Sequence, residues 1–148
     1  AQQAAGAHLP ALLQRLEAPQ PRVALGQALA GRAHAAIDLS DGLIGDLGHI
    51  LDTSACGARL QAGQLPVSPS LATLPADQRW QCLLAGGDDY ELLFTASPVN
   101  RAQIMEAAGR VGTVVTRIGE ITAANGLLIV DADGQPLQGR FSGYDHFC

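Results

Sequence analysis

The segment Asp38-Leu39-Ser40-Asp41-Gly42 carries two carboxylates three positions apart, with a hydroxyl between them. Carboxylate oxygens are the ligands that a hard cation such as Mg²⁺ prefers. Apolar residues precede the segment and a helical repeat of apolar residues follows it, so it lies where a strand ends and a helix begins. Backbone N–H groups at a helix N-terminus also attract phosphate. The segment is a candidate site for a metal ion and nucleotide phosphates, unless Ser40 and Asp41 serve only as a helix cap.

A second segment, Gly86-Gly87-Asp88-Asp89-Tyr90-Glu91, places three carboxylates within four residues, directly after a glycine pair. Paired glycines allow another piece of backbone to approach closely. Neighbouring like charges raise the pKa of at least one carboxyl, unless a metal ion, an arginine or a cationic substrate compensates them. The segment is therefore either part of a ligand site or a solvated turn whose Asp side chains bond nearby N–H groups.

Both segments resemble signatures of the thiamine-monophosphate kinase family. The resemblance is carried by residues 37–51 (IDLSDGLIGDLGHIL), residues 85–95 (AGGDDYELLFT) and the ending at residues 143–147 (GYDHF), with order and spacing in agreement from about Pro21 to Phe147. That family belongs to the superfamily of aminoimidazole-ribonucleotide synthetase and selenophosphate synthetase, whose ATP site has no Walker lysine. The basic residues here are all Arg, which agrees with the resemblance.

The resemblance implies ATP-dependent phosphorylation of thiamine monophosphate to thiamine diphosphate, with Mg²⁺ as the cofactor. It implies that Asp38 and Asp41 bind Mg²⁺, that Ser40 contacts ATP, and that Glu91 and Phe147 contact the thiamine phosphate. A carboxylate and an aromatic ring suit a thiazolium cation. The acceptor is already an anion, so little general-base catalysis is needed and no residue is assigned as catalytic.

Some assignments within these motifs stay open. Tyr144 is an alternative to Phe147 as the ring that meets the substrate. Asp88 and Asp89 match the motif and either order the glycine turn or reach a metal through water.

Members of the family are longer by about one N-terminal domain, which carries further metal-binding aspartates and the dimer-forming sheet. Residues 1–148 are therefore expected to form a single domain, the C-terminal half of a two-domain kinase that is a homodimer when full-length. The expected partners are ATP, thiamine monophosphate and the chain's own N-terminal domain. Phosphoryl transfer requires nucleotide, metal ions and acceptor to be held together, so this half alone is expected to be a poor catalyst.

Two other functions are open on the sequence alone. The chain could be a non-catalytic scaffold or interaction domain whose acids serve as caps and turns. It could also belong to a sister enzyme of the superfamily that acts on another acceptor.

Composition excludes several further classes of protein. The net charge of -5, from 9 basic and 14 acidic residues, argues against binding nucleic acid. Without Lys, the chain has no P-loop lysine and no Schiff base. The spacing of Cys56, Cys82 and Cys148 indicates neither a zinc site nor a disulfide framework. No apolar run approaches 18 residues and no signal peptide is present, so we expect a cytoplasmic chain with no membrane contact.

The pattern of apolar residues predicts the elements that position these motifs. We expect helices at residues 8–17, 21–30, 41–51 (with Ser40 as N-cap), 75–84 and 97–109, the last burying Met105. We expect strands at residues 34–39 (a buried strand), 58–61 and 90–95, and a loop over residues 65–74. Asp46 and His49 are expected to share a hydrogen bond on the helix surface.

The C-terminal third carries hairpin signals. Asn125-Gly126 and Asp133-Gly134 flank an apolar run at residues 127–130, and residues 111–122 are rich in strand formers, which predicts two or three antiparallel strands. The whole pattern predicts an α+β fold with a mixed, mostly antiparallel sheet packed with helices. By resemblance, this is the fold of the C-terminal domain of aminoimidazole-ribonucleotide synthetase.

Overall fold

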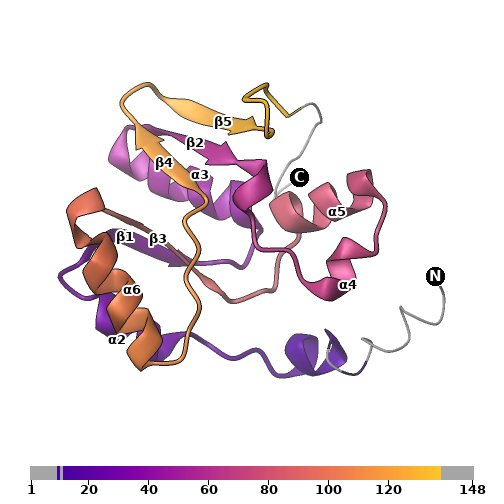
Figure 1. Cartoon of the computed structure of the whole chain (residues 1–148), viewed down its shortest axis with the longest axis horizontal. Coiled ribbons are helices and arrows are strands. Elements are labelled where there is room, and N and C mark those ends of the chain that lie inside the picture. Colours follow the sequence, from indigo (N-terminus) through magenta and orange to yellow (C-terminus); the bar gives the residue numbers. More distant parts are fainter. Residues whose placement is uncertain (1–9, 11, 138–148) are drawn as a thin grey trace.

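The computed structural model describes residue 10 and residues 12–137 of the chain (Figure 1). Residues 12–17 are helical, as expected for the first helix. The named helices are α2 (Val23–Leu29), α3 (Leu43–Ser54), α4 (Pro69–Ala72), α5 (Ala76–Ala85) and α6 (Arg101–Arg110), with 3-10 turns η1 (Ala62–Gln64) and η2 (Pro98–Asn100). The strands are β1 (Ala33–Asp38), β2 (Gly57–Gln61), β3 (Leu92–Ala96), β4 (Gly119–Thr122) and β5 (Gly126–Val130).

The strands form two small sheets. β1 pairs with β3 in antiparallel orientation, and β2 lies between an antiparallel β4 and a parallel β5. Figure 1 shows the three-stranded sheet lying apart from the β1–β3 pair, with α3 along its face. Most pairings are antiparallel and one is parallel, so the predicted α+β class with a mixed, mostly antiparallel sheet is confirmed.

The expected hairpin at Asn125-Gly126 is wrong, because β4 and β5 pair with opposite edges of β2 and not with each other. The connection between them crosses the end of β2 at Gly57. A Cβ on Gly57 would overlap the carbonyl oxygens of Ala124 and Gly126, so glycine is what allows the crossing. The second hairpin signal is confirmed, since Val130 and Pro136 form an antiparallel bridge around the turn at Gly134.

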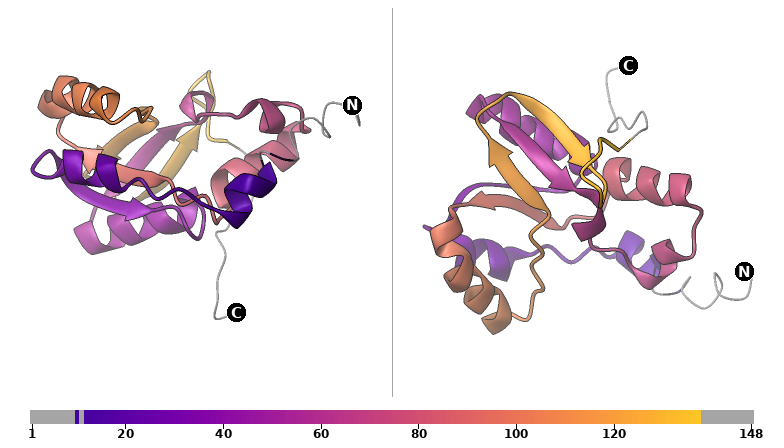
Figure 2. Two further views of the ribbon diagram at one scale, coloured as in Figure 1. Left: turned by 90° about the horizontal axis from the view of Figure 1, so that it is seen from below. Right: turned by 45° about the horizontal axis from the view of Figure 1, so that its top comes forward.

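Two apolar clusters hold the fold together. In the larger, Leu43, Leu47 and Leu51 of α3 pack with Leu60 of β2 and the fully buried Leu84 of α5. In the smaller, α2 and α6 pack against the β1–β3 pair through their buried residues Leu25, Leu29, Ile104 and Ala108. Figure 2 shows α2 and α6 together at one end of the molecule and α3 with the three-stranded sheet at the other.

Several sequence predictions need correction. β1 is half-buried, and its residues alternate between partly buried and exposed. The predicted loop over residues 65–74 contains α4, which Ser68 caps by accepting a hydrogen bond from the Leu71 N–H (3.2 Å). Met105 is 51% exposed on α6; Ala107 and Ala108 pack inward in its place. Among the described residues, no helix is long and apolar enough to cross a membrane.

Candidate functional site

The turn formed by residues 38–42, here called the acid turn, joins the end of β1 to the start of α3. The helix begins at Leu43, with Gly42 as N-cap and no side-chain cap, so the prediction that Ser40 caps this helix is wrong. A side chain from the first turn of the helix holds the two residues just before the N-cap. Oδ2 of Asp46 accepts hydrogen bonds from the backbone N–H groups of Ser40 (3.0 Å) and Asp41 (3.1 Å).

Asp46 is the site residue that sequence reasoning missed. It is 1% exposed, whereas the sequence interpretation placed it on the helix surface beside His49, which is exposed. The hydrogen bonds to residues five and six positions earlier explain the burial, because they satisfy a carboxylate that would otherwise be costly to bury. The sequence pattern that could have identified Asp46 is an acid in the first turn of a helix that follows a polar turn.

The second segment, residues 86–91, lies directly against the acid turn. The Asp88 N–H donates to the Ser40 carbonyl (3.0 Å), the Tyr90 N–H donates to the Leu39 carbonyl (2.9 Å), and the Leu39 N–H donates to the Glu91 carbonyl (2.9 Å). A Cβ on Gly87 would overlap the Ser40 carbonyl oxygen, so the glycine allows this approach. The structure therefore brings together two motifs that are separated by more than forty residues in the sequence.

Tyr90 lies where the acids of the two motifs meet. Its hydroxyl donates to Oδ1 of Asp88 (3.1 Å), and this hydrogen bond raises the pKa of the Tyr90 phenol. The negative charges of Asp88, Asp38 and Asp41 act in the same direction. Asp88 and Tyr90 both adopt positive φ angles (63° and 51°), a conformation that non-glycine residues adopt rarely and that is concentrated at functional sites.

Asp89 and Glu91 have different surroundings. Burial raises the pKa of Asp89, and the neighbouring Glu91 carboxylate raises it further. Glu91 accepts from Arg22 through both its oxygens (2.8 Å and 2.6 Å) and from Arg15 (2.6 Å). The Arg22 hydrogen bonds lower the pKa of Glu91, which is therefore held as a carboxylate between two guanidinium groups.

The structure places Asp38, Ser40, Asp41 and Glu91 in or beside this junction, with Asp38 exposed and Ser40 and Asp41 half-buried. Phe147 and Tyr144 lie outside the described residues. In residue 10 and residues 12–137, no group of three or more His, Cys, Asp or Glu side chains is arranged to hold a metal ion. A cation at Asp38 and Asp41 would therefore need further oxygen ligands from another source.

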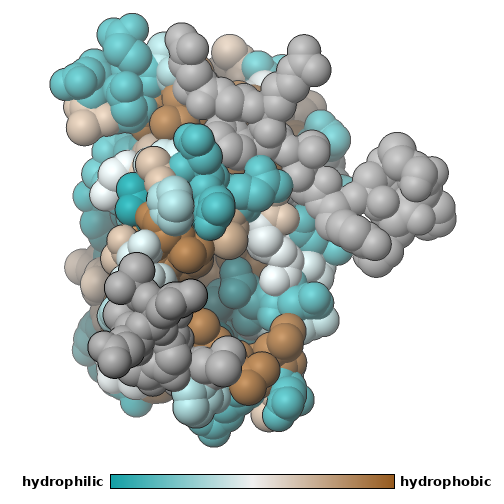
Figure 3. Space-filling model, turned by 90° about the vertical axis from the view of Figure 1, so that its right-hand side faces the viewer, coloured by the Kyte–Doolittle hydropathy of each residue, from teal (hydrophilic) through white to brown (hydrophobic). Residues whose placement is uncertain are grey.

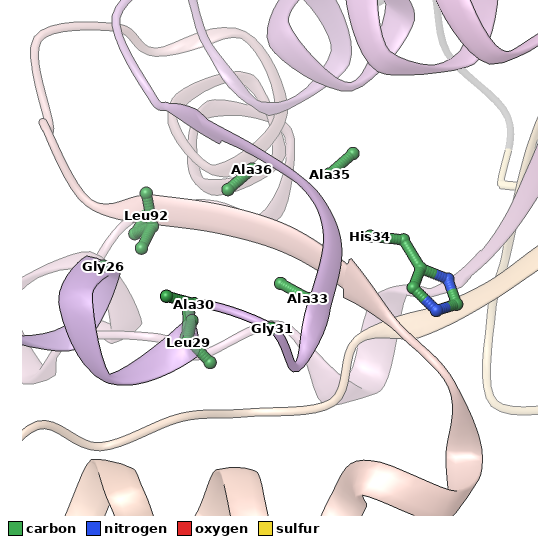
Figure 4. Close-up of a pocket in the computed structure, with 9 residues that line it drawn as sticks. All are labelled: Gly26, Leu29, Ala30, Gly31, Ala33, His34, Ala35, Ala36 and Leu92. Carbon is green, nitrogen blue, oxygen red and sulfur yellow. The ribbon is translucent and has the colours of Figure 1, made fainter.

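Two hollows of the structure are lined by residues other than those of the acid turn. One, of about 220 Å³, is formed between α2 and the β1–β3 pair and is lined by small and apolar residues such as Gly31, Ala36 and Leu92 (Figure 4). Another, of about 380 Å³, is lined by residues of α3, β1 and β3 that include Ile50 and Thr95. None of the predicted site residues lines either of these hollows.

Comparison with known proteins agrees with the resemblance seen in the sequence. The thiamine-monophosphate kinase of Escherichia coli (strain K12) is 45% identical over 138 residues, which cover 93% of this chain and 42% of that protein. The enzyme of that name from Salmonella typhimurium is 47% identical over 139 residues, again 93% of this chain and 42% of the relative. The chain thus spans less than half the length of these relatives.

Solved structures agree in fold. The crystal structure of thiamine-monophosphate kinase from Stenotrophomonas maltophilia K279a matches with a TM-score of 0.77 and 43% identity, over 86% of this chain and 40% of that one. The structure described as AaThiL complexed with AMPPCP and TMP matches with a TM-score of 0.70 and 27% identity, over 93% and 41%. Residues 5–131 match the family described as AIR synthase related protein, C-terminal domain. Since that match extends over most of the sequence, the chain belongs to the AIR synthase related protein family as a C-terminal domain.

Proposed function

We propose that this chain is the C-terminal part of a kinase that transfers the γ-phosphoryl group of ATP to thiamine monophosphate and forms thiamine diphosphate. The names of the relatives and the neighbour complexed with AMPPCP and TMP support the proposal. The observation that carries it is the junction of the two motifs, where backbone hydrogen bonds join the acid turn to residues 88–91. That junction gathers Asp38, Asp41 and Asp88 around Tyr90.

In this reaction Asp38 and Asp41 would hold Mg²⁺, because their carboxylates are hard oxygen ligands at the end of β1. When bound, the ion neutralises charge on the crowded phosphates. The Ser40 hydroxyl, between the two acids, would contact ATP. The described residues hold no group of three or more such ligands, so the remaining ligands would be phosphate oxygens, water or groups from another part of the protein.

Glu91 and Phe147 would receive the thiamine phosphate. The thiazolium ring is a cation, and an ionised carboxylate attracts it. The hydrogen bonds from Arg22 and Arg15 keep Glu91 ionised. Because these two guanidinium groups carry more positive charge than Glu91 compensates, at least one of the two pairs would have to open for the thiazolium ring to bind. Phe147 would add an aromatic face.

The remaining part of the site would come from the protein's own N-terminal domain, in a homodimeric and cytoplasmic enzyme. The relatives are more than twice as long as this chain, which leaves room for such a domain. The helical segment at residues 12–17 also exposes three leucines, Leu12, Leu13 and Leu16 (64% exposed). Figure 3 shows hydrophobic residues reaching the surface among hydrophilic ones on one face of the molecule. Exposed apolar groups of this kind are typical of surfaces that bind another domain or subunit.

The proposal is tested by assaying the full-length protein with Mg-ATP and thiamine monophosphate, and with free thiamine and an aminoimidazole ribonucleotide precursor as competing acceptors. We expect thiamine diphosphate from the first acceptor and no phosphorylation of the others. Preferential turnover of the aminoimidazole compound would identify the protein as a sister enzyme of the superfamily. If the folded full-length protein transfers no phosphoryl group to any acceptor, the proposal is contradicted and a scaffold function remains.

A further inference from the structure

A buried carboxylate holds the acid turn from beneath. Asp46 is 1% exposed, and its Oδ2 accepts from the backbone N–H groups of both Ser40 and Asp41. The same turn is held from the other side, because the carbonyls of Leu39 and Ser40 accept from Tyr90 and Asp88. The backbone of the turn is thus fixed by hydrogen bonds from two directions.

These hydrogen bonds determine which kind of ligand the turn can bind. A phosphate bound at the start of a helix uses the unpaired N–H groups there. Helix α3 begins at Leu43, so the N–H groups of Ser40 and Asp41 lie just before that start. These two N–H groups already serve an internal anion, and the charge of Asp46 would repel a phosphate that approached them. A cation near Asp38 and Asp41 is instead attracted by Asp46, since the negative charge of this buried side chain is poorly screened.

We propose that Asp46 is a positioning residue that commits the acid turn to a divalent cation and denies the Ser40 and Asp41 amides to phosphate. The cation would be met by the side chains of Asp38 and Asp41, whose backbone Asp46 fixes from within the helix. The inference rests on the proposed function only in taking this cation to be the Mg²⁺ that accompanies ATP. It predicts that the turn reaches a nucleotide through the metal ion and the Ser40 hydroxyl.

The first test uses Mn²⁺ as the probe and the full-length protein with AMPPCP. Asp46→Asn keeps the shape of the side chain and removes its charge, so we expect the dissociation constant for Mn²⁺ to rise at least tenfold. Asp52→Asn removes an exposed acid from the same helix and should change it less than twofold. Leu47→Ala controls for lost stability: it empties a buried position on α3 and should lower the unfolding temperature without changing Mn²⁺ affinity.

Three outcomes would overturn the proposal. One is a folded Asp46→Asn variant with wild-type affinity for Mn²⁺, and another is a Leu47→Ala variant that loses as much affinity as Asp46→Asn. The third is a wild-type protein that binds no Mn²⁺. A wild type that shows Asp46-dependent Mn²⁺ binding and yet transfers no phosphoryl group would overturn the proposed function and support this inference.

The second test needs no variant, so it stands even if Asp46→Asn fails to fold. Amide resonances of the wild-type 148-residue chain are followed by NMR during titration with inorganic phosphate. Because Asp46 occupies the N–H groups of Ser40 and Asp41, we expect their resonances to stay in place and their hydrogen exchange to be slow. Phosphate-induced shifts at these two amides, or exchange as fast as in an unstructured peptide, would overturn the proposal.

Discussion

The carboxylates of the site are close together, yet each has a different environment. Asp38 is exposed at the end of β1, Asp46 is buried under the acid turn, and Glu91 is held between Arg15 and Arg22. An exposed carboxylate can exchange water for a ligand, whereas a buried one with backbone partners is fixed in place. The environment of each carboxylate therefore distinguishes acids that are open to a ligand from acids that organise the protein. Residue type alone does not make this distinction.

Replacing either candidate metal ligand should remove activity and leave the fold intact. Asp38→Asn or Asp41→Asn in the full-length protein is expected to lower kcat by about 100-fold or more, because charge stabilisation in the transition state is lost. Thermal unfolding should change little for Asp38→Asn, since this side chain is exposed. Steady-state assays with Mg-ATP and thiamine monophosphate measure the effect, with Asp52→Asn as the control. Wild-type rates in both variants would remove the metal assignment.

The pairing of Glu91 with Arg22 should make part of the stability depend on pH. The pKa of Glu91 is lowered in the folded state, so the pairing stabilises the fold above the unfolded pKa of about 4.3 and is lost as the pH falls through the lower folded value. Glu91 is 39% exposed, so solvent screening limits the contribution to about 1 kcal/mol or less.

Arg22→Met should therefore destabilise the chain at pH 7 and show a smaller difference from wild type at pH 3.5, measured by urea unfolding. Arg101→Met, which removes an exposed arginine from α6, is the control. A difference for Arg22→Met that is as large at pH 3.5 as at pH 7 would show that the arginine acts through packing of its stem and not through Glu91.

At the scale of elements, the proposed function requires the acid turn and residues 86–91 to approach each other closely. Gly87→Ala would place a Cβ against the Ser40 carbonyl oxygen, which accepts from the Asp88 N–H. Backbone has to shift to relieve this overlap, so we expect destabilisation of about 1–3 kcal/mol and a marked loss of activity in the full-length protein.

Gly48→Ala is the matched control for that substitution. A Cβ at Gly48 meets nothing within 4 Å, and the residue lies inside α3, so alanine should leave stability unchanged or raise it by about 0.5–1 kcal/mol. Chemical unfolding of both variants checks the comparison. If Gly87→Ala retains the stability and activity of the wild type, the close approach is not needed.

Local patterns in the sequence were sufficient to predict most elements but not their long-range partners. The apolar spacing of Leu43, Leu47 and Leu51 predicts α3 correctly, because it reports burial on one helix face. The bonds from Asp46 to the turn were missed, since helical periodicity describes contacts three and four residues apart. The Glu91 pairs join residues 76 and 69 positions apart, and no local pattern contains them.

Pairing of strands was the least predictable feature. Asn125-Gly126 is a typical hairpin signal, but the sheet places β2 between the two strands that it connects. A hairpin signal specifies a reversal of the chain and does not specify whether a third strand lies between its arms. The connection crosses β2 at Gly57, where only a residue without a Cβ allows the other backbone to approach so closely.

At the scale of the whole molecule, Asp38 of the acid turn and the leucines of residues 12–17 are exposed. Both features fit a chain that is completed by another domain. If that domain is the N-terminal half of the proposed kinase, the two halves expressed separately should restore activity when mixed. Neither half alone should form thiamine diphosphate, and the rate should rise with the concentration of the added half until it saturates.

The exposed leucines provide a specific test of this assembly. Leu16→Glu puts a charge on the apolar face of the helical segment and should raise the concentration needed for half-maximal activity about tenfold or more, which corresponds to at least about 1.4 kcal/mol. Val114→Glu, at a position that is 91% exposed outside that face, is the matched control and should leave the concentration unchanged. Equal effects of the two substitutions would exclude the leucine face as the contact. Thiamine diphosphate formed by the 148-residue chain alone would exclude the need for a second half altogether.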